Sequence, residues 1–279
     1  MTVGEIIDAV IKKTGAQRLA HDMTCDHLMA GSLDAKVTKI VTTFMATADV
    51  IRKAIDLGAD LIITHEPTWF TGKDDTLWLE GDPVYLAKKK LIDDSGIAIW
   101  RFHDHMHMDH DDGIFRGFDE EMGWSSYRMA PDPQAQGFFA GRFDCCYKIP
   151  ATTLGGLADF LKQKFELKAI RVIGDPDSPV ERVGVLPGGG SLGLGVEYMP
   201  MQLMRRRDLD TLICGDITEW TLPAYARDAY QLGFGKSIIV LGHERSEEPG
   251  MKHLGTWMAP IVDGIPVVFV DSGEPFTMY

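Results

Sequence analysis

The sequence predicts an α/β protein built from two related α/β lobes with mixed sheets. Short runs rich in valine and isoleucine alternate along the chain with longer segments of helical period. The order of these segments in the first half is echoed in the second half. Because strands alternate with helices of this length, the sheets are expected to be largely parallel or mixed.

The elements can be assigned in order from their periodicity. The chain opens with an amphipathic helix over residues 1–13. Strands are expected at residues 39–46, 61–66, 96–102, 181–187, 211–216, 236–243 and 265–271. Further helices are expected at residues 47–58, 82–96, 152–165 and 222–233.

An internal echo suggests where the two lobes lie. The letters THEP at 64–67 correspond to CGDI at 214–217, and WRFHDH at 100–105 to VLGHER at 240–245. We therefore predict a discontinuous first lobe, residues 1–125 plus 236–279, and a second lobe, residues 126–235, with a proline-containing crossing at 127–137. The alternative is that any two α/β units show a similar order of segments.

Composition limits the function classes. The 279 residues are 45% hydrophobic, which is ample for well-packed cores, and no apolar run reaches the length of a membrane span. The first residues do not resemble a signal peptide, and the four cysteines show no CxxC spacing, so we expect reduced thiols and a cytoplasmic protein. A net charge of −13 works against nucleic-acid and anionic-membrane partners.

Polar residues follow several of the predicted strands, where ligands of α/β sheets usually bind. His65 and Glu66 come at the end of one strand, and a zincin helix is excluded there because Trp69 replaces the second histidine. His243 and Glu247 stand at i and i+4, which places them on one face if a helix begins there. The pair Asp216 and Glu219 follows the strand at 211–216 and is a candidate for the same pocket.

The segment FHDHMHMDHDDG, residues 102–113, contains four of the nine histidines. In an extended strand His103, His105 and His107 would share one face. His105 and Asp109 are four residues apart, and a solvated surface loop could hold the same letters.

Convergence of these groups would imply metal, because several carboxylates buried beside histidines without a cation would be costly. Two imidazoles and three carboxylates exceed what one tetrahedral zinc requires, which favours a pair of divalent ions. The alternative is that the polar strand ends have a purely structural role.

Other chemistries find less support. The glycine-rich stretch at 186–195 lacks the endings of phosphate-binding and dinucleotide-binding loops, so we interpret it as a tight turn. No G-x-S-x-G elbow is present, and the arginine run at 205–207 is interpreted as a solvated helix face, although it could meet an anionic substrate.

With its motifs in this order, the sequence resembles the dinuclear metal-centre family of GTP cyclohydrolase 1 type 2 homologues, also called NIF-three-like proteins. ADLIITHEPTWF is similar to the family's D-x-I-I-x-H-H-P, and HMHMD is similar to its H-T-N-L-D. TLICGDITEW is similar to its TGE/D segment, and GHERSE to its G-H-x-x-x-E. The resemblance covers nearly the whole chain and implies two lobes with metals in the cleft between them, a ring-shaped homohexamer and no inserted domain.

Carried over position by position, the resemblance implies a set of site residues. The metal ligands fall on His65, Asp109, His243 and Glu247, with Glu66 in place of the family's second histidine. An oxygen ligand at that position would shift preference from zinc toward manganese, iron or magnesium. The resemblance also places His105 in the pocket, while Glu219 stands where the family often has histidine. His103, His107 and His110 are expected to line the pocket rather than to bind metal.

The resulting hypothesis is a metal-dependent hydrolase with two divalent ions (Zn, Mn, Fe or Mg). The ions would lower the pKa of a bridging water, and the hydroxide formed would attack a C–N or phosphoester centre of a small, nucleotide-like substrate. His105 or Glu219 would transfer protons. The alternative is a metal-storage, metal-insertion or regulatory binding protein without turnover, which would need the same ligands.

Overall fold

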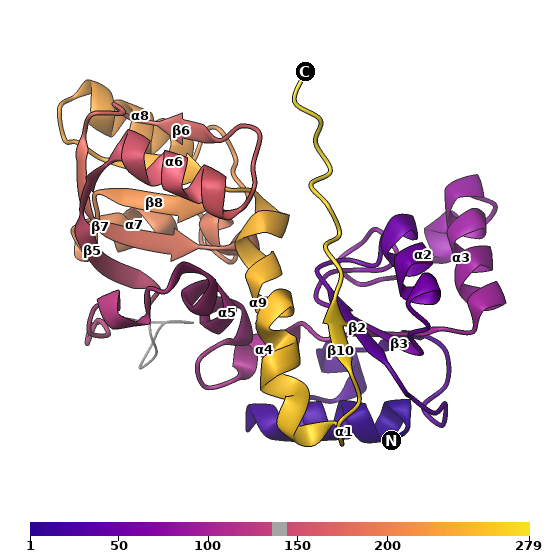
Figure 1. The fold of residues 1–279 in the computed structure, drawn as a ribbon. Helices are drawn as coiled ribbons and strands as arrows, with labels where there is room; N and C mark the ends of the chain where they lie inside the picture. Colours follow the sequence, from indigo (N-terminus) through magenta and orange to yellow (C-terminus); the bar gives the residue numbers. More distant parts are fainter. Residues whose placement is uncertain (136–143) are drawn as a thin grey trace. The chain divides into compact units, whose positions relative to one another are not determined.

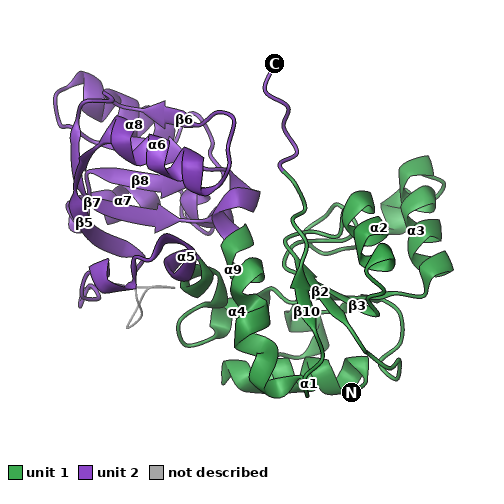
Figure 2. Cartoon of the chain, viewed as in Figure 1, with its two compact units in different colours: residues 1–117, 248–273 green, residues 118–247, 274–279 purple. Residues whose placement is uncertain are grey.

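The computed structural model describes residues 1–135 and 144–279 and divides the chain into two compact units (Figure 2). Unit 1 comprises residues 1–117 and 248–273, and unit 2 comprises residues 118–247 and 274–279. Residues 118–125, 236–247 and 274–279, which we expected in the first lobe, belong to unit 2. Residues 236–247 do so because β9 (Ser237–Val240) pairs with strands of the second sheet. The last two residues of the expected crossing, 136 and 137, lie outside the described residues.

The sheet of unit 1 has the strand order β1-β4-β3-β2-β10. Its members are β1 (Leu28–Ala30), β2 (Ile40–Thr43), β3 (Leu61–Thr64), β4 (Ala98–Arg101) and β10 (Val267–Phe269). The pairs from β4 to β10 are parallel, and β1 is antiparallel to β4 at the edge. The prediction of a mixed sheet is therefore confirmed for this unit.

Helices cover both faces of this sheet, because alternate strand residues point to opposite sides. On one face, Leu61 and Ile63 pack with α1 (Val3–Thr14) and with the second half of α9 (His243–Met258). On the other face, Ile62 packs with α2 (Ala48–Asp56) and α3 (Pro83–Ser95) (Figure 1). Two hydrophobic cores thus hold the ends of β3 and β4 in fixed positions.

The sheet of unit 2 has the order β5-β7-β8-β9-β6 and is also mixed. Parallel pairing joins β7 (Pro179–Leu186), β8 (Thr211–Cys214) and β9. Antiparallel edges are formed by β5 (Cys146–Thr153) and β6 (Arg171–Ile173). The unit also contains α6 (Leu154–Lys164), α7 (Met199–Arg206) and α8 (Leu222–Gln231).

The expected strands and helices are present, with ends shifted by a few residues. The condition under which His103, His105 and His107 would share one face is not met, since residues 102–113 are not extended. This segment contains α4 (Asp104–Met108) and the start of α5 (Gly113–Met122). Among the described residues, no helix is long and apolar enough to cross a membrane.

Candidate metal centre

In unit 1 the polar groups gather where β3 and β4 end. These strands are parallel neighbours with Thr64 opposite Arg101, so the segments that follow them emerge side by side. The backbone N–H groups of His65 and Glu66 both donate to the carbonyl of Phe44, at 3.1 and 2.9 Å, which fixes the turn after β3 against the end of β2. The side chain of His65 is fully buried at this point.

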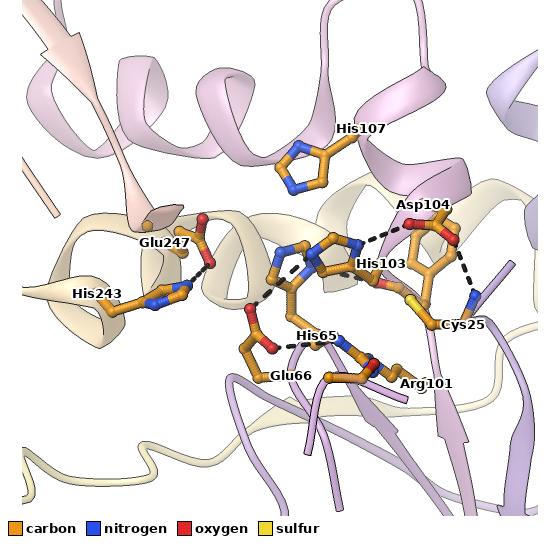
Figure 3. A network of polar contacts seen from close by, with 12 residues as sticks. Cys25, His65, Glu66, Arg101, His103, Asp104, His107, His243 and Glu247 are labelled. Atoms are coloured by element: carbon orange, nitrogen blue, oxygen red, sulfur yellow. Dashed lines mark hydrogen bonds and ion pairs between the residues drawn. The ribbon is translucent and has the colours of Figure 1, made fainter. Parts of the chain in front are cut away.

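Helix α4 brings two more histidines to His65. Because His103 stands immediately before the helix and His107 lies four residues later, both point to the same side of α4 (Figure 3). Their rings lie 4.8 Å apart between centroids, and His65 lies 4.5 Å from His103 and 5.0 Å from His107. Each of the three offers a nitrogen within 4.8 Å of the others, so they form a group that could hold a metal ion.

All three histidines are oriented through Nδ1. Nδ1 of His65 lies 3.2 Å from the carbonyl oxygen of Phe102. Nδ1 of His103 lies 3.0 Å from Oδ1 of Asp104, and Nδ1 of His107 lies 2.9 Å from Oδ2 of Asp112. An acceptor at Nδ1 keeps the proton there and leaves Nε2 as the metal-binding nitrogen, which is the arrangement usual around bound metals.

Asp104 is itself well anchored. It accepts hydrogen bonds from the Thr24 hydroxyl and the Cys25 N–H, both at 2.9 Å. The hydrogen bond with His103 and these two contacts hold the pKa of Asp104 well below its usual range, despite partial burial. Burial raises the pKa of the neighbouring Cys25 thiol to about 12. Asp104 is therefore an ionised carboxylate that fixes the His103 ring.

Glu66 is held by a buried arginine. The guanidinium of Arg101 lies 3.3 Å from Oε2 of Glu66 and 3.4 Å from Oδ2 of Asp74. The same side chain donates to the backbone carbonyls of His65 and Gly72, at 3.2 and 2.7 Å. The other oxygen of Glu66 lies 3.9 Å from Nε2 of His103, so the carboxylate faces the imidazole group (Figure 3).

His105 points away from this group. It is almost fully buried, with Nδ1 2.6 Å from Oδ2 of Asp26 and Nε2 accepting the N–H of Leu19 at 3.1 Å. Both ring nitrogens are bonded within the fold, which argues against the proton transfer that we expected of His105. A helix explains the difference, since alternate residues of a helix do not share a face.

Asp109, expected as a metal ligand, ends α4 and forms an ion pair with Arg116. The distance between Oδ2 of Asp109 and Nη1 of Arg116 is 2.5 Å, and the carboxylate is largely buried. Binding of a cation by Asp109 would require this ion pair to open. His110 is 94% exposed and pairs with Asp111, so it lies outside the imidazole group.

In unit 2 the equivalent group follows β9. His243 is the first residue of α9, and its Nε2 lies 3.1 Å from Oε2 of Glu247, one turn later. Its Nδ1 lies 2.8 Å from Oδ2 of Asp216, which follows β8. Asp216 therefore orients His243 as Asp104 orients His103. Glu219 is exposed in the turn before α8.

The glycine-rich loop packs directly against this pair. Gly188 follows β7 with φ +49°, and its N–H donates to the Ser246 hydroxyl at 3.0 Å. A Cβ at Gly188 would overlap Oε1 of Glu247 and lie 2.7 Å from Nε2 of His243. The sequence analysis interpreted this loop as a tight turn and missed its contact with the site residues.

Comparisons with known proteins agree on one family. The sequence model of the family described as Duf34/NIF3 (NGG1p interacting factor 3) matches residues 1–275. A Clostridium acetobutylicum protein named GTP cyclohydrolase 1 type 2 homolog is 27% identical over 80% of this chain and 77% of its own. A Vibrio cholerae protein of the same name is 23% identical over 96% of this chain and 98% of its own.

Solved structures show the same fold. A hypothetical protein from Staphylococcus aureus matches 100% of this chain and 99% of its own with a TM-score of 0.74 and 18% identity. A Bacillus cereus protein related to NIF3 matches with the same coverage and identity and a TM-score of 0.73.

Proposed function

Because the chain belongs to the Duf34/NIF3 (NGG1p interacting factor 3) family, we propose that it binds two divalent metal ions and uses them for hydrolysis. The observation that carries this proposal is the geometry of His243. Asp216 holds its Nδ1, and the carboxylate of Glu247 lies beside its Nε2. An imidazole oriented by a carboxylate and paired with an oxygen donor at i+4 is a typical half of a divalent-metal site.

The donor types fit divalent metal. Each unit by itself holds an imidazole and a carboxylate that could bind a divalent ion, namely His65 and Glu66 in unit 1 and His243 and Glu247 in unit 2. Nitrogen and oxygen donors together suit zinc, iron and manganese, while magnesium would rely on the carboxylates. A divalent ion held by these residues would supply Lewis acidity and would lower the pKa of a coordinated water to about 7.

The remaining residues have positioning or proton-transfer roles. Arg101 fixes Glu66, and Asp216 fixes the His243 ring. Of the two groups expected to transfer protons, Glu219 is the one that is exposed and able to exchange a proton with a substrate. The shared name of the relatives, GTP cyclohydrolase 1 type 2 homolog, supports a C–N bond in a small, nucleotide-like substrate, and a phosphoester is the second bond type that we propose.

Metal analysis of matched variants tests the proposal. Protein purified from cells grown with Mn, Fe or Zn should contain near-stoichiometric metal, and His65→Ala and Glu247→Gln should each lose metal while circular dichroism and the melting temperature remain close to wild type. Wild-type protein without metal under every condition would contradict the proposal.

A substrate panel separates the hydrolase from a binding protein. Nucleotides, cyclic amidines and phosphoesters should be assayed with the loaded protein and with Glu247→Gln as a blank. Turnover that depends on Glu247 supports the hydrolase, while silence with all metals supports a storage, insertion or regulatory protein.

We also propose a homohexamer, the assembly that the family resemblance implies. Light scattering coupled to gel filtration should give six times the chain mass of 31.0 kDa. A monomer at micromolar concentration would contradict this part of the proposal.

A further inference from the structure

Unit 1 contains two donors that the family motifs do not include. His103 lies before the segment similar to H-T-N-L-D, and His107 stands where that motif has asparagine. Both rings nevertheless lie against His65, and each of the three histidines offers a ring nitrogen within 4.8 Å of the others. We propose that His65, His103 and His107 form an all-imidazole site that binds one nitrogen-preferring transition ion, such as Zn²⁺ or Co²⁺.

The hydrogen bonds at Nδ1 of the three histidines support this assignment. Each Nδ1 lies 2.9–3.2 Å from a carbonyl or carboxylate oxygen that is itself fixed by the fold. These acceptors come from three different positions: the end of β4, the first turn of α4 and the start of α5. Because the rings are already oriented, little conformational freedom is lost when an ion binds.

Burial gives the site a closed side and an open side. His65 is fully buried, whereas the side chains of His103 and His107 are 26% and 23% exposed. A cation can therefore reach the rings from the side of α4. Three protein ligands with access to solvent correspond to a catalytic zinc site, in which water occupies the fourth position.

The donor set determines which cation is favoured. Three imidazoles prefer Zn²⁺, Co²⁺, Ni²⁺ or Cu²⁺ over Mg²⁺ and Mn²⁺, which prefer oxygen. On the Nε2 side of the rings, one oxygen of Glu66 lies 3.9 Å from Nε2 of His103, and Arg101 holds its other oxygen. The set of ligands in unit 1 is therefore softer than Glu66 alone suggested. Glu66 alone predicted a preference for manganese, iron or magnesium.

Cobalt titration tests this inference, which rests on the proposed function. Wild-type protein should bind Co²⁺ with visible absorption, and Zn²⁺ should displace it. His103→Ala and His107→Ala should each weaken Co²⁺ binding at this site by at least about 100-fold, since even outer ligands account for about 10–100-fold. His110→Ala, in the same segment but fully exposed, is the matched control and should bind as wild type does.

A second variant preserves the test if the alanine variants fold poorly. Asp112→Asn keeps Oδ1, which accepts the N–H of Ile114 at the start of α5. It replaces Oδ2 by an amide nitrogen and so weakens the hydrogen bond with Nδ1 of His107. We expect about 10–100-fold weaker Co²⁺ binding with an unchanged melting temperature of the metal-free protein. In the cobalt protein, three shifted, exchangeable Nδ1–H proton resonances should appear.

The outcomes distinguish the two proposals. If wild type holds Mn or Fe but binds neither Co²⁺ nor Zn²⁺, the all-imidazole site is wrong and the proposed function stands; if it holds no divalent metal at all, both fail. If wild type binds metal and folded His103→Ala, His107→Ala and Asp112→Asn bind it equally well, the all-imidazole site is wrong and the proposed function stands. Loss in these variants with retention in His110→Ala supports the site.

Discussion

Units 1 and 2 place a histidine at the same topological point but surround it differently. In each unit three parallel strands occur in chain order, β2-β3-β4 and β7-β8-β9. The third strand is followed within three residues by a helix that begins at or next to a histidine, His103 in unit 1 and His243 in unit 2. One turn later stands a second donor, His107 or Glu247.

An aspartate before the middle strand strengthens the equivalence. Asp60 and Asp210 each use Oδ2 to accept backbone N–H groups at the start of the preceding strand. The backbone N–H of each aspartate donates to the same segment, at Lys39 or Arg182. Its backbone carbonyl accepts the N–H of the first residue of the third strand, β4 or β9. Helical spacing and strand order are thus shared, whereas the donor at i+4 differs between imidazole and carboxylate. The fold fixes where a ligand stands, and single residues set its chemistry.

The largest expected difference between the units concerns two aspartates, Asp26 in unit 1 and Asp216 in unit 2, which hold the segments that carry the histidines. Asp26 is fully buried and accepts the backbone N–H groups of His103, Asp104 and His105. Asp26→Ala leaves these donors without that acceptor and should reduce the free energy of unfolding by about 3–5 kcal/mol, measured by urea denaturation.

Asp216 is the aspartate that holds His243 in unit 2. Its side chain is 43% exposed, so Asp216→Ala should cost less than about 1 kcal/mol and instead weaken metal binding by about 10–100-fold. Equal losses of stability in the two variants would contradict the contrast between a buried anchor and an exposed one.

The next effect concerns Gly188, whose backbone lies close to His243 and Glu247 in unit 2. Gly188→Ala combines a left-handed backbone, which costs about 1–2 kcal/mol, with overlap of the new methyl group and Glu247, which costs about 1–3 kcal/mol more. We expect a loss of about 3 kcal/mol in unfolding free energy and of metal held by His243.

Gly195 provides the control for Gly188. It has φ +87°, and a Cβ built there meets nothing within 4 Å. Gly195→Ala should therefore show the backbone cost alone and retain metal. If both variants lose metal equally, the methyl overlap is not the cause.

The sequence was sufficient for the family and for seven of the ten strands in the described part of the chain, but it did not predict β1, β5 and β6 or the helices α5 and α7. Strands such as β3 are short apolar runs, and helices such as α2 and α3 have clear caps and faces, so periodicity identified them. The placement of His243 and Glu247 on one face was also predictable, because residues at i and i+4 are neighbours once a helix begins at His243.

The histidine segment shows why the rest could not be predicted. Its alternation of His103, His105 and His107 matches a strand, while burial of Met106 and His105 on one side selects a short helix. That choice depends on packing against Asp26 and Leu19, which lie far away in sequence. The one available signal was that His103 and His107 repeat the spacing of His243 and Glu247.

The smallest expected effect tests whether Asp60 and Asp210 have equivalent roles in the two units. Asp60→Ala and Asp210→Ala each remove hydrogen bonds to backbone N–H groups at a strand start, so each should cost about 1 kcal/mol at pH 7, and the two values should agree within about 0.5 kcal/mol.

Burial alone would raise the pKa of Asp60, but hydrogen bonds from Thr38 and Lys39 outweigh it and lower the pKa. A lowered folded pKa means that this stabilisation is present above the unfolded pKa of about 4 and is lost as pH falls through the folded value. Urea unfolding at pH 7 and pH 3 should therefore show a smaller difference between wild type and Asp60→Ala at the lower pH, and a difference that grows on acidification would refute the ionised, hydrogen-bonded state of Asp60.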